Sequence, residues 1–577
     1  MSKAPLQWDE EVDVLVIGTG AGAMVAALTA AQQGVRTLIV EKSELYGGSS
    51  ASSGGGVWIP ASHSALAQGQ QDSPEEAFIY IKGLVGNHVA DEKIRAFTEN
   101  ARVMVRYVEA HSGLRFQAIP YTDYHAEKPG GKMGYRSHET NTLDAADLDP
   151  ADFRSLRPTH PSAALFGYIP WTTMEAAPMV TRGPGWMKTM AKVLWRYYSD
   201  IPQRLKSKRS RFLVFGNAIA GHLKIALNRE GARMWLRAPL VELIREGDGA
   251  VLGAIIEKDG RRVAVRAHKG VILGAGGFER NQEMRETYLP GEGRAEWSGG
   301  QENNTGDAIR AGMDIGAATD LMHEAWWAPT VKVPSEIRGR PLFYERALPG
   351  CIIVNQLGER YLNEARSYDV VGKGMIDADR PDKRTIPSWI VFDARFRQKY
   401  PMGPLLPVLP DWVHSREVRN MAKKASSVAD LARQTGMDPT VLESTIARFN
   451  GFARSGVDED FGRGSAPYDR YYGDQNVTPN PNLAPVEQAP FYALPLYPGD
   501  IGTKGGLATD EAAHVLDHAG KPIPGLYAIG NNAASVMGPA YPGAGSTLGP
   551  AMTFGYLAAI DAVDAQQGVS KRKSSAA

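Results

Sequence analysis

The N-terminal segment limits the fold more strongly than any other part of the chain. Residues 12–17 are mostly apolar and predict a short buried strand, which a run of small residues follows at once. That run reads Gly18, Thr19, Gly20, Ala21, Gly22 and Ala23. Gly18 allows a tight turn, Gly20 lets backbone N–H groups approach a pyrophosphate, and Ala23 permits close packing of the next helix. The segment therefore predicts a Rossmann-like α/β domain whose first helix directs its positive end toward a dinucleotide.

The second predicted strand, residues 37–40, ends at an acidic residue. Glu41 stands where a carboxylate hydrogen-bonds a ribose hydroxyl in such domains, and Lys42 follows it. A carboxylate at this position also repels a 2′-phosphate, which argues against NADP. We expect Glu41 and Lys42 to contact the cofactor.

Later segments indicate FAD rather than NAD. A stretch with little side-chain bulk can lie against a planar cofactor and offer N–H and hydroxyl donors. Its predicted cofactor residues are Gly48, Ser49, Ser50, Ser53, Gly54, Gly55 and Gly56. The apolar residues 57–60 that follow favour a packed segment over a flexible linker. Two distant segments add Gly274, Ala275, Gly276, Asn304, Asp307, Gly530 and Asn531. An extended FAD crosses its whole domain and needs such returns of the chain, whereas NAD needs only the first motif.

Length and composition set the remaining limits. A chain of 577 residues is long enough for two to four domains. One domain can be inserted into another, whose sequence is then discontinuous. Lys plus Arg equals Asp plus Glu, 64 against 64, so no overall field attracts nucleic acid. The single cysteine, Cys351, excludes an internal disulfide framework and a cysteine metal cluster, and we expect no metal. With no visible signal peptide or membrane-spanning run, we expect a cytoplasmic protein in which Cys351 is buried filler.

Three blocks of the chain, 11–60, 271–307 and 497–555, resemble the flavoprotein superfamily of fumarate reductase and succinate dehydrogenase. Within that superfamily the sequence is similar to the 3-ketosteroid Δ1-dehydrogenases. The matching motifs are Gly47-Gly48-Ser49, Ser53-Gly54-Gly55-Gly56-Val57-Trp58-Ile59-Pro60, Asp123-Tyr124-His125, Arg360-Tyr361-Leu362-Asn363-Glu364, Pro498-Gly499-Asp500-Ile501-Gly502-Thr503-Lys504-Gly505-Gly506 and Tyr541-Pro542-Gly543-Ala544-Gly545-Ser546-Thr547. The resemblance implies an FAD-binding domain that contains an inserted α+β catalytic domain.

The positions of the motifs divide the chain. We expect residues 1–328 and 489–567 to form the FAD-binding domain and residues 329–488 to form the catalytic domain. The small, polar and basic tail, 568–577, is expected to be disordered.

Two chemistries compete within the superfamily. Dicarboxylate reduction needs cations, and the enzymes that perform it share a His before the late Gly-Gly and an Arg in the C-terminal glycine motif. Here Lys504 precedes Gly505-Gly506, and Tyr541 stands near the expected Arg, so an apolar ketone fits better. Three alternatives remain. The protein could desaturate another enone or ketone, it could perform 4,5-desaturation of a ketosteroid, or it could be a non-catalytic flavin-binding subunit.

The resemblance also assigns roles to individual residues. The Tyr541 hydroxyl and the Gly545 N–H would donate to the C3 oxygen of a 3-ketosteroid, Tyr368 would take the C2 proton, and Tyr124 would hydrogen-bond to Tyr368. If the alignment with the family is shifted in these regions, Tyr121, Tyr344 or Tyr361 would take the place of Tyr124 or Tyr368. Gly545, Thr547 and Leu548 would also contact the flavin.

The resemblance implies noncovalent FAD, because Ser49, Ser50 and Ala51 stand where covalently flavinylated members carry the attachment histidine. The hydride would pass from C1 of the steroid to FAD. The electrons would then leave for an acceptor that the sequence does not identify, a quinone or an artificial dye.

The segment 164–215 combines aromatic residues with many cations. Between about 178 and 211 the basic residues far outnumber the acidic ones, and Trp186, Trp195, Tyr197 and Tyr198 lie among them. This pattern fits contact with the inner face of a membrane, and it fits equally a solvated helical hairpin with a basic face.

Overall fold

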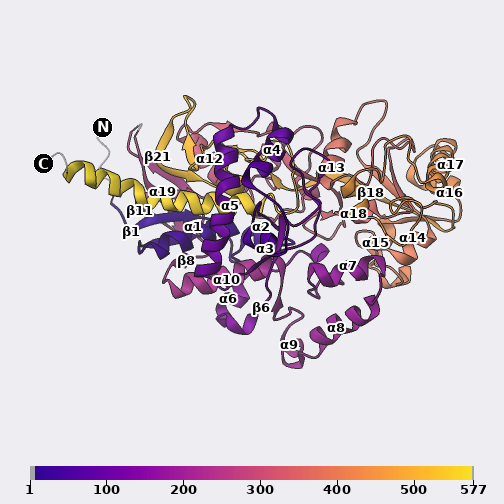
Figure 1. Ribbon diagram of the computed structural model, residues 1–577, viewed down its shortest axis with the longest axis horizontal. Coiled ribbons are helices and arrows are strands. Elements are labelled where there is room, and N and C mark those ends of the chain that lie inside the picture. The colour runs from indigo at the N-terminus through magenta and orange to yellow at the C-terminus, as the bar shows by residue number, and fades with distance from the viewer. Residues whose placement is uncertain (1–6, 248, 575–577) are drawn as a thin grey trace.

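The computed structural model describes residues 7–247 and 249–574 (Figure 1). The last helix, α19, is Leu548–Ser574. Side chains from residue 565 onward lie outside the described part, and so does the order of the tail 568–577.

The first domain is built on an eight-stranded sheet with the order β20-β21-β11-β1-β2-β8, to which β9 and β10 add on β11. Its strands are β1 (Glu10–Ile17), β2 (Thr37–Val40), β8 (Arg233–Trp235), β9 (Leu240–Arg245), β10 (Val251–Lys258), β11 (Arg261–Leu273), β20 (His514–Leu516) and β21 (Pro522–Ala528). The central strands β8, β2, β1, β11 and β21 run parallel. Because β1, β11 and β21 come from distant parts of the sequence, their ends bring the three predicted cofactor segments to one edge.

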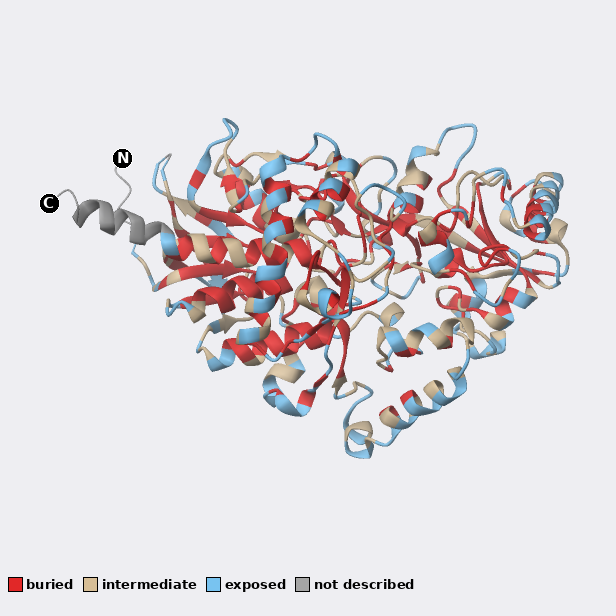
Figure 2. Ribbon diagram, viewed as in Figure 1, coloured by how far each residue is buried: buried red, intermediate tan, exposed pale blue. Residues whose placement is uncertain are grey.

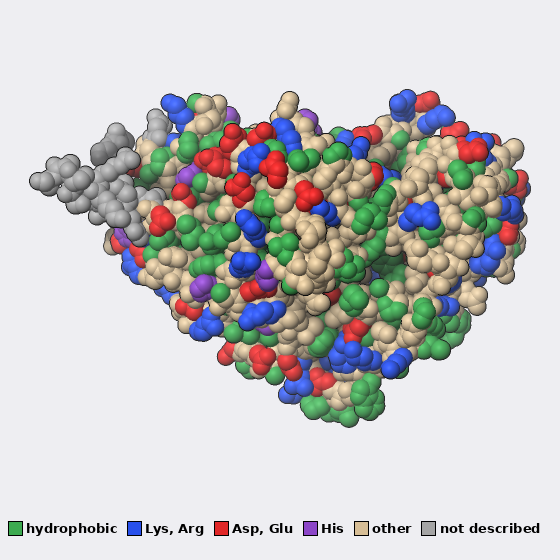
Figure 3. Space-filling model, in the orientation of Figure 1, with side chains coloured by type: hydrophobic (Ala, Val, Ile, Leu, Met, Phe, Trp, Pro, Cys, Tyr) green, Lys and Arg blue, Asp and Glu red, His purple; other side chains and the backbone are tan. Residues whose placement is uncertain are grey.

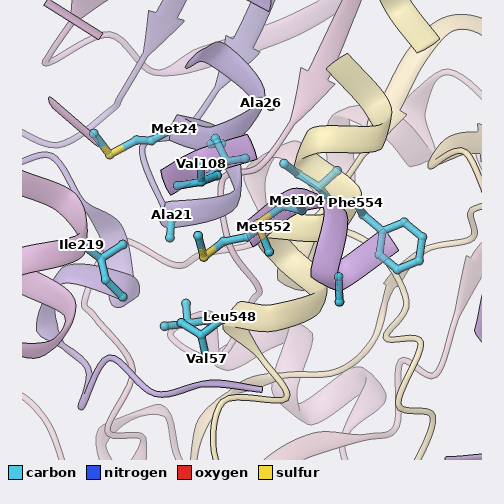
Figure 4. Close-up of a cluster of buried hydrophobic side chains, with 14 of the residues drawn as sticks. Ala21, Met24, Ala26, Val57, Met104, Val108, Ile219, Leu548, Met552 and Phe554 are labelled. Atoms are coloured by element: carbon cyan, nitrogen blue, oxygen red, sulfur yellow. The ribbon is translucent and has the colours of Figure 1, made fainter. Parts of the chain in front are cut away.

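Both faces of this sheet are buried. On one face α1 (Ala21–Gln32) and α19 pack together with α10 (Phe215–Arg229), and Figure 4 shows Met24, Met552 and Ile219 from these helices in one apolar cluster. On the other face β9, β10 and α12 (Asp307–Asp314) cover Leu15 and Ile17. A sheet buried on both sides explains why residues 12–17 are mostly apolar rather than alternating.

The inserted part contains an antiparallel sheet with the order β14-β13-β18-β16-β15, and β17 pairs with β18. Its strands are β13 (Ala325–Val331), β14 (Arg340–Pro341), β15 (Cys351–Val354), β16 (Ser388–Phe392), β17 (Lys423–Ala425) and β18 (Phe491–Thr503). Its first and last strands reach beyond the range 329–488 that we expected for the catalytic domain. Cys351 is fully buried in β15, as expected. The combination of a parallel FAD-type sheet and an inserted antiparallel sheet confirms the predicted fold class.

The segment 164–215 forms three helices, α7 (Thr173–Thr181), α8 (Trp186–Tyr198) and α9 (Ile201–Lys206). They lie along the lower right of the molecule, where Figure 2 shows mostly exposed and half-exposed residues. None of the helices in the described part is long and apolar enough to cross a membrane.

Candidate active site

A cavity of about 640 Å³ runs from the carboxyl ends of the parallel strands to the inserted part. Every site residue predicted from the sequence lies on its wall. Glu41 and Lys42 line one end, and the tyrosines line the other, so the cavity connects the predicted dinucleotide site to the predicted substrate site.

Glycines shape the dinucleotide end of the cavity. Gly18 has φ +101°, and a Cβ there would lie 2.4 Å from the Gly274 carbonyl oxygen at the end of β11. A Cβ on Gly22 would lie 2.4 Å from the Ala551 oxygen, so this residue lets α1 approach α19. A Cβ on Gly20 would meet no atom closer than Ser50 Oγ at 3.5 Å, so there is space on the cavity side at the start of α1.

The polar groups at this end suit FAD. Glu41 accepts hydrogen bonds from Thr19 Oγ1 (2.5 Å) and from the Ser43 N–H (2.9 Å), and burial raises its pKa. Lys42 Nζ lies 2.5 Å from Asp307 Oδ2, so two predicted cofactor residues also pair with each other. The first turn of α1 holds no acidic residue, and its N-cap residue, Gly20, has no side chain, so its N-terminal N–H groups other than that of Ala21 remain for an anion. This donor set and the glycine cradle fit the cofactor.

The serine-rich segment forms the middle of the wall as α2 (Gly48–Ser52). Ser50 Oγ accepts from the Ala21 N–H at 3.0 Å, and Asn304 Nδ2 donates to Ser49 Oγ at 3.0 Å. Asn304 also donates to buried Glu279 Oε1 at 2.5 Å, a contact that the sequence did not indicate. These bonds hold three distant segments around one cavity.

At the other end three predicted tyrosines meet. Tyr124 Oη donates to Tyr368 Oη at 3.0 Å, and the ring of Tyr541 lies 5.1 Å from that of Tyr124 and 5.4 Å from that of Tyr368. All three are at most 5% exposed. Burial raises the pKa of Tyr124 and Tyr368 well above the ordinary tyrosine value, so ionisation of either needs a compensating charge.

Gly545 lies beside Tyr541 on the cavity wall, with φ +94°. A Cβ at this position would lie 2.6 Å from the Gly56 carbonyl, so only glycine fits. The Gly545 oxygen accepts from the Trp58 N–H at 3.1 Å, whereas no acceptor among the described residues takes up the Gly545 N–H. That N–H is therefore free to serve a ligand.

The three alternative tyrosines, Tyr121, Tyr344 and Tyr361, differ in whether they reach the cavity. Tyr121 and Tyr344 also line the cavity, whereas Tyr361 Oη lies 2.6 Å from Ser388 Oγ and does not.

Sequence reasoning missed part of the site. Tyr468 packs 4.8 Å behind Tyr124, ring to ring, and Phe343 packs 5.0 Å from Tyr368. Thr173 and Val180 of α7 also line the cavity, although α7 belongs to the segment that we considered only as a surface element. The tyrosine-rich motif at 468–472 was a signal that the sequence offered.

The fold and the cofactor wall define a flavoprotein, and a family model described as FAD binding domain matches residues 13–548. A 3-oxosteroid 1-dehydrogenase of Mycolicibacterium smegmatis is 41% identical over 568 residues, or 96% of this chain and 97% of that protein. The crystal structure of 3-ketosteroid Δ1-dehydrogenase from Sterolibacterium denitrificans with 1,4-androstadiene-3,17-dione has a TM-score of 0.93 and 45% identity. It covers 96% of this chain and 100% of that chain.

The chain belongs to the 3-oxosteroid 1-dehydrogenase family of FAD-dependent oxidoreductases. The predicted family and the predicted cofactor, FAD, are thereby confirmed. A 4-oxocyclohexanecarboxylate 2-dehydrogenase of Sinomonas cyclohexanicum is also similar, at 35% identity over 95% of this chain and 92% of that protein.

Proposed function

We propose that this chain catalyses the FAD-dependent 1,2-desaturation of 3-ketosteroids. The observation that carries the proposal is the meeting of Tyr124, Tyr368 and Tyr541 with the free Gly545 N–H at one end of the FAD cavity. The relatives named above as 3-oxosteroid 1-dehydrogenases support this substrate class.

Tyr541 and Gly545 polarise the ketone. The Tyr541 hydroxyl and the Gly545 N–H donate to the C3 oxygen, which stabilises the negative charge that develops there when C2 loses its proton. Their burial strengthens this effect, because little water competes for the oxygen.

Tyr368, as a tyrosinate that has released its own proton, takes the C2 proton, and the hydrogen bond that Tyr124 donates to it holds its oxygen in place. FAD, when bound, accepts the hydride that leaves C1, and the electron pair of the C2–H bond forms the C1–C2 double bond. We further propose that reduced FAD passes its electrons to a quinone, for which an artificial dye substitutes in an assay.

The test is incubation of the purified protein with 4-androstene-3,17-dione and a dye acceptor, with the product identified by NMR. A 1,4-diene is expected. The saturated 5α-steroid distinguishes 1,2- from 4,5-desaturation, and 4-oxocyclohexanecarboxylate tests the second substrate class that the Sinomonas relative suggests. Turnover of that acid alone, or 4,5-desaturation alone, would refute the proposal.

We also propose that α8 and α9 contact the inner face of a membrane. Leu205 is 84% exposed and Trp195 is 75% exposed, and Met187, Tyr198 and Ile201 are also exposed on these helices. Figure 3 shows apolar side chains gathered at the lower tip, where α9 lies. Exposed apolar residues beside Lys188, Lys192 and Lys206 suit an anionic lipid surface.

Vesicle sedimentation tests this contact. Because Val180 and Thr181 line the cavity, point substitutions are better than deletion of the segment. Trp195→Glu with Leu205→Glu should abolish binding to vesicles that contain phosphatidylglycerol, whereas Ile337→Glu, at an exposed apolar residue in the loop before β14, should not. If the wild-type protein stays in the supernatant at low salt, the basic hairpin is only a solvated surface.

A further inference from the structure

Lys504 is a fully buried cation that lies behind the tyrosines of the cavity. Its Nζ donates to Asp369 Oδ1 at 3.2 Å and to the Pro539 carbonyl at 2.8 Å, and it lies 4.9 Å from the centre of the Trp326 ring. The described residues that line the cavity do not include Lys504. Its side chain therefore acts on a bound steroid only through these three neighbours.

The contact with Asp369 reaches the proposed base. Asp369 directly follows Tyr368, and both lie in the first turn of α13 (Tyr368–Asp377). The ion pair is buried, because the side chain of Lys504 is 0% exposed and that of Asp369 is 9% exposed. A helix whose first turn is tied in this way does not shift along its axis without breaking the ion pair. Lys504 therefore restrains the position of Tyr368.

The other two contacts reach the proposed carbonyl donor. Pro539 stands two residues before Tyr541, and the ring of Trp326 packs on that of Tyr541 with centroids 4.7 Å apart. The Trp326 Nε1 also donates to Asn531 Oδ1 at 3.2 Å, at a predicted cofactor residue. One ammonium thus joins the helix of the base in the inserted part to the supports of Tyr541 in the FAD-binding part.

The backbone of Lys504 is fixed as well. Its N–H donates to the Glu324 carbonyl at 2.9 Å, and its own carbonyl accepts from the Ser535 N–H at 3.0 Å. Replacing a buried ion pair by apolar residues of similar volume is often neutral for stability, because both charges of the pair lose their water. What the pair with Asp369 adds is one fixed geometry between the two parts of the chain.

We propose that Lys504 is a positioning residue that sets the distance between the hydroxyls of Tyr368 and Tyr541. The inference rests on the proposed function, in which Tyr368 takes the C2 proton while Tyr541 holds the C3 oxygen. Because C2 and C3 are bonded to each other, the two hydroxyls must reach neighbouring atoms of one ring at the same time. Lys504 itself exchanges no proton.

Single-turnover flavin reduction by a 3-ketosteroid tests this inference. Lys504→Met removes the charge and keeps an apolar side chain of similar length. The rate of flavin reduction should fall about 100-fold, as for a misplacement of about 1 Å, while steroid binding and FAD content change little. An unchanged rate, or a loss that lies only in binding, would overturn the inference.

A second variant separates geometry from stability. Lys504→Met together with Asp369→Leu replaces the ion pair by two apolar side chains and leaves no unpaired charge, so its melting temperature should return toward that of the wild type. Its flavin reduction should stay slow, and recovery of the rate would overturn the inference. This double variant decides by the same rate criterion if Lys504→Met alone does not fold.

Lys224→Met is the matched control. Lys224 also forms an ion pair, with Asp152 at 3.0 Å, and their side chains are only 11% and 17% exposed. Neither residue is among the described residues that line the cavity. This variant should lose stability with an unchanged rate of flavin reduction. An equal loss of rate would show that any broken buried ion pair slows the enzyme, and would overturn the role given to Lys504.

A double-mutant cycle shows whether Lys504 acts through the base. In the Tyr368→Phe protein, Lys504→Met should add little to the loss of rate, because the group that it positions is already gone. A further loss as large as that in the wild-type background would overturn the inference.

A fluorine NMR spectrum separates this inference from the proposed function. With 3-fluorotyrosine in place of Tyr368, the FAD-loaded protein should give one sharp resonance, and Lys224→Met should leave it unchanged. Lys504→Met should shift and broaden it, because the first turn of α13 loses its tie. This measurement needs no turnover, so it decides even if no 1,4-diene forms, and coincident spectra would overturn the inference.

Discussion

At the residue scale, Tyr541 and Tyr368 share a cavity but differ in their neighbours. Tyr541 packs against Trp326 with ring centroids 4.7 Å apart and lies beside Gly545, whereas Tyr368 shares a hydrogen bond with Tyr124. In the mechanism that we propose, the Tyr541 hydroxyl holds the carbonyl oxygen and the Tyr368 oxygen exchanges the proton. Their removal should therefore affect different steps.

Tyr541→Phe should weaken steroid binding and slow hydride transfer together, with a combined loss of about 3–4 kcal/mol in kcat/KM, as for a lost oxyanion donor. Steady-state kinetics and stopped-flow flavin reduction measure both effects. A normal KM with a normal rate would remove Tyr541 from the carbonyl site.

Tyr368→Phe should leave steroid binding nearly intact while exchange of the C2 hydrogen with deuterated water and flavin reduction both collapse. Tyr361→Phe is the control, because its hydroxyl contacts Ser388 outside the cavity. FAD content should be unchanged in all three tyrosine variants. Near-normal turnover in Tyr368→Phe would transfer the base role to Tyr344 or Tyr121, which also line the cavity.

Part of the site was readable from the sequence, and part was not. Glycine motifs and the tyrosines near them mark cofactor and carbonyl positions, because local backbone requirements leave local signatures. The tyrosine-rich run that contains Tyr468 is visible in the sequence, but its contact with Tyr124 is not, because the two residues come from distant parts of the chain. The contact between Gly22 and α19 could not be predicted from the sequence either, because it depends on how the two helices pack.

At the element scale, His514 ties the edge strand β20 to α19. Its Nδ1 lies 2.9 Å from Asp510 Oδ2, and its Nε2 lies 2.8 Å from Asp561 Oδ2 on α19. Tyr527 Oη of β21 also donates to Asp561 at 2.8 Å. The hydrogen bonds with Asp510 and Asp561 raise the pKa of His514 to about 10.

This cluster should make stability depend on pH. Because the folded pKa exceeds the unfolded value of 6.5, the stabilisation is complete below pH 6.5 and disappears as pH rises through about 10. His514→Gln should lower the free energy of unfolding on the order of 2 kcal/mol at the acid end. Denaturant titrations across this range should show the gap closing, while exposed His88→Gln shows none. A gap that does not depend on pH would contradict the ionic role.

The elements of the first domain were also easier to predict than those of the second. The strand expected at 37–40 is β2, and that at 12–17 lies within β1. Both are short apolar runs beside a glycine, because Gly18 follows the first and Gly34 shortly precedes the second. The domain limits 329–488 stay a prediction. The strands β13 and β18 pair although they are far apart in the sequence, and no local sequence motif indicates this pairing.

At the scale of the whole molecule, one cavity holds residues from nearly the entire chain. Two histidines, His138 and His160, line it. The ring nitrogens of His138 contact Ser62 Oγ at 2.6 Å and the Arg136 carbonyl at 2.9 Å, and His160 Nδ1 lies 2.7 Å from Ser162 Oγ. Both ring nitrogens of His138 and Nδ1 of His160 thus bond within the protein, and noncovalent FAD stays a prediction.

Acid precipitation of the purified yellow protein should therefore release all flavin into the supernatant as intact FAD. Absorbance and chromatography of the supernatant measure this. Flavin that remains in the pellet would show a covalent bond. Readdition of FAD to the apoprotein at 100 times its Kd should raise stability by about 2.7 kcal/mol.

The hydrogen bond from Tyr124 to Tyr368 joins the FAD-binding part of the chain to the inserted part. The Tyr124 N–H donates to the Pro542 carbonyl at 2.8 Å, which ties Tyr124 to the FAD-binding part. Tyr368 is the first residue of α13 (Tyr368–Asp377), and α13 packs on the antiparallel sheet. A small rotation of one part against the other would separate these two hydroxyls and would leave the glycines around the dinucleotide site in place. On slow heating, activity should be lost at a lower temperature than the one at which flavin is released. The protein then passes through a yellow but inactive state, and cooling should restore its activity.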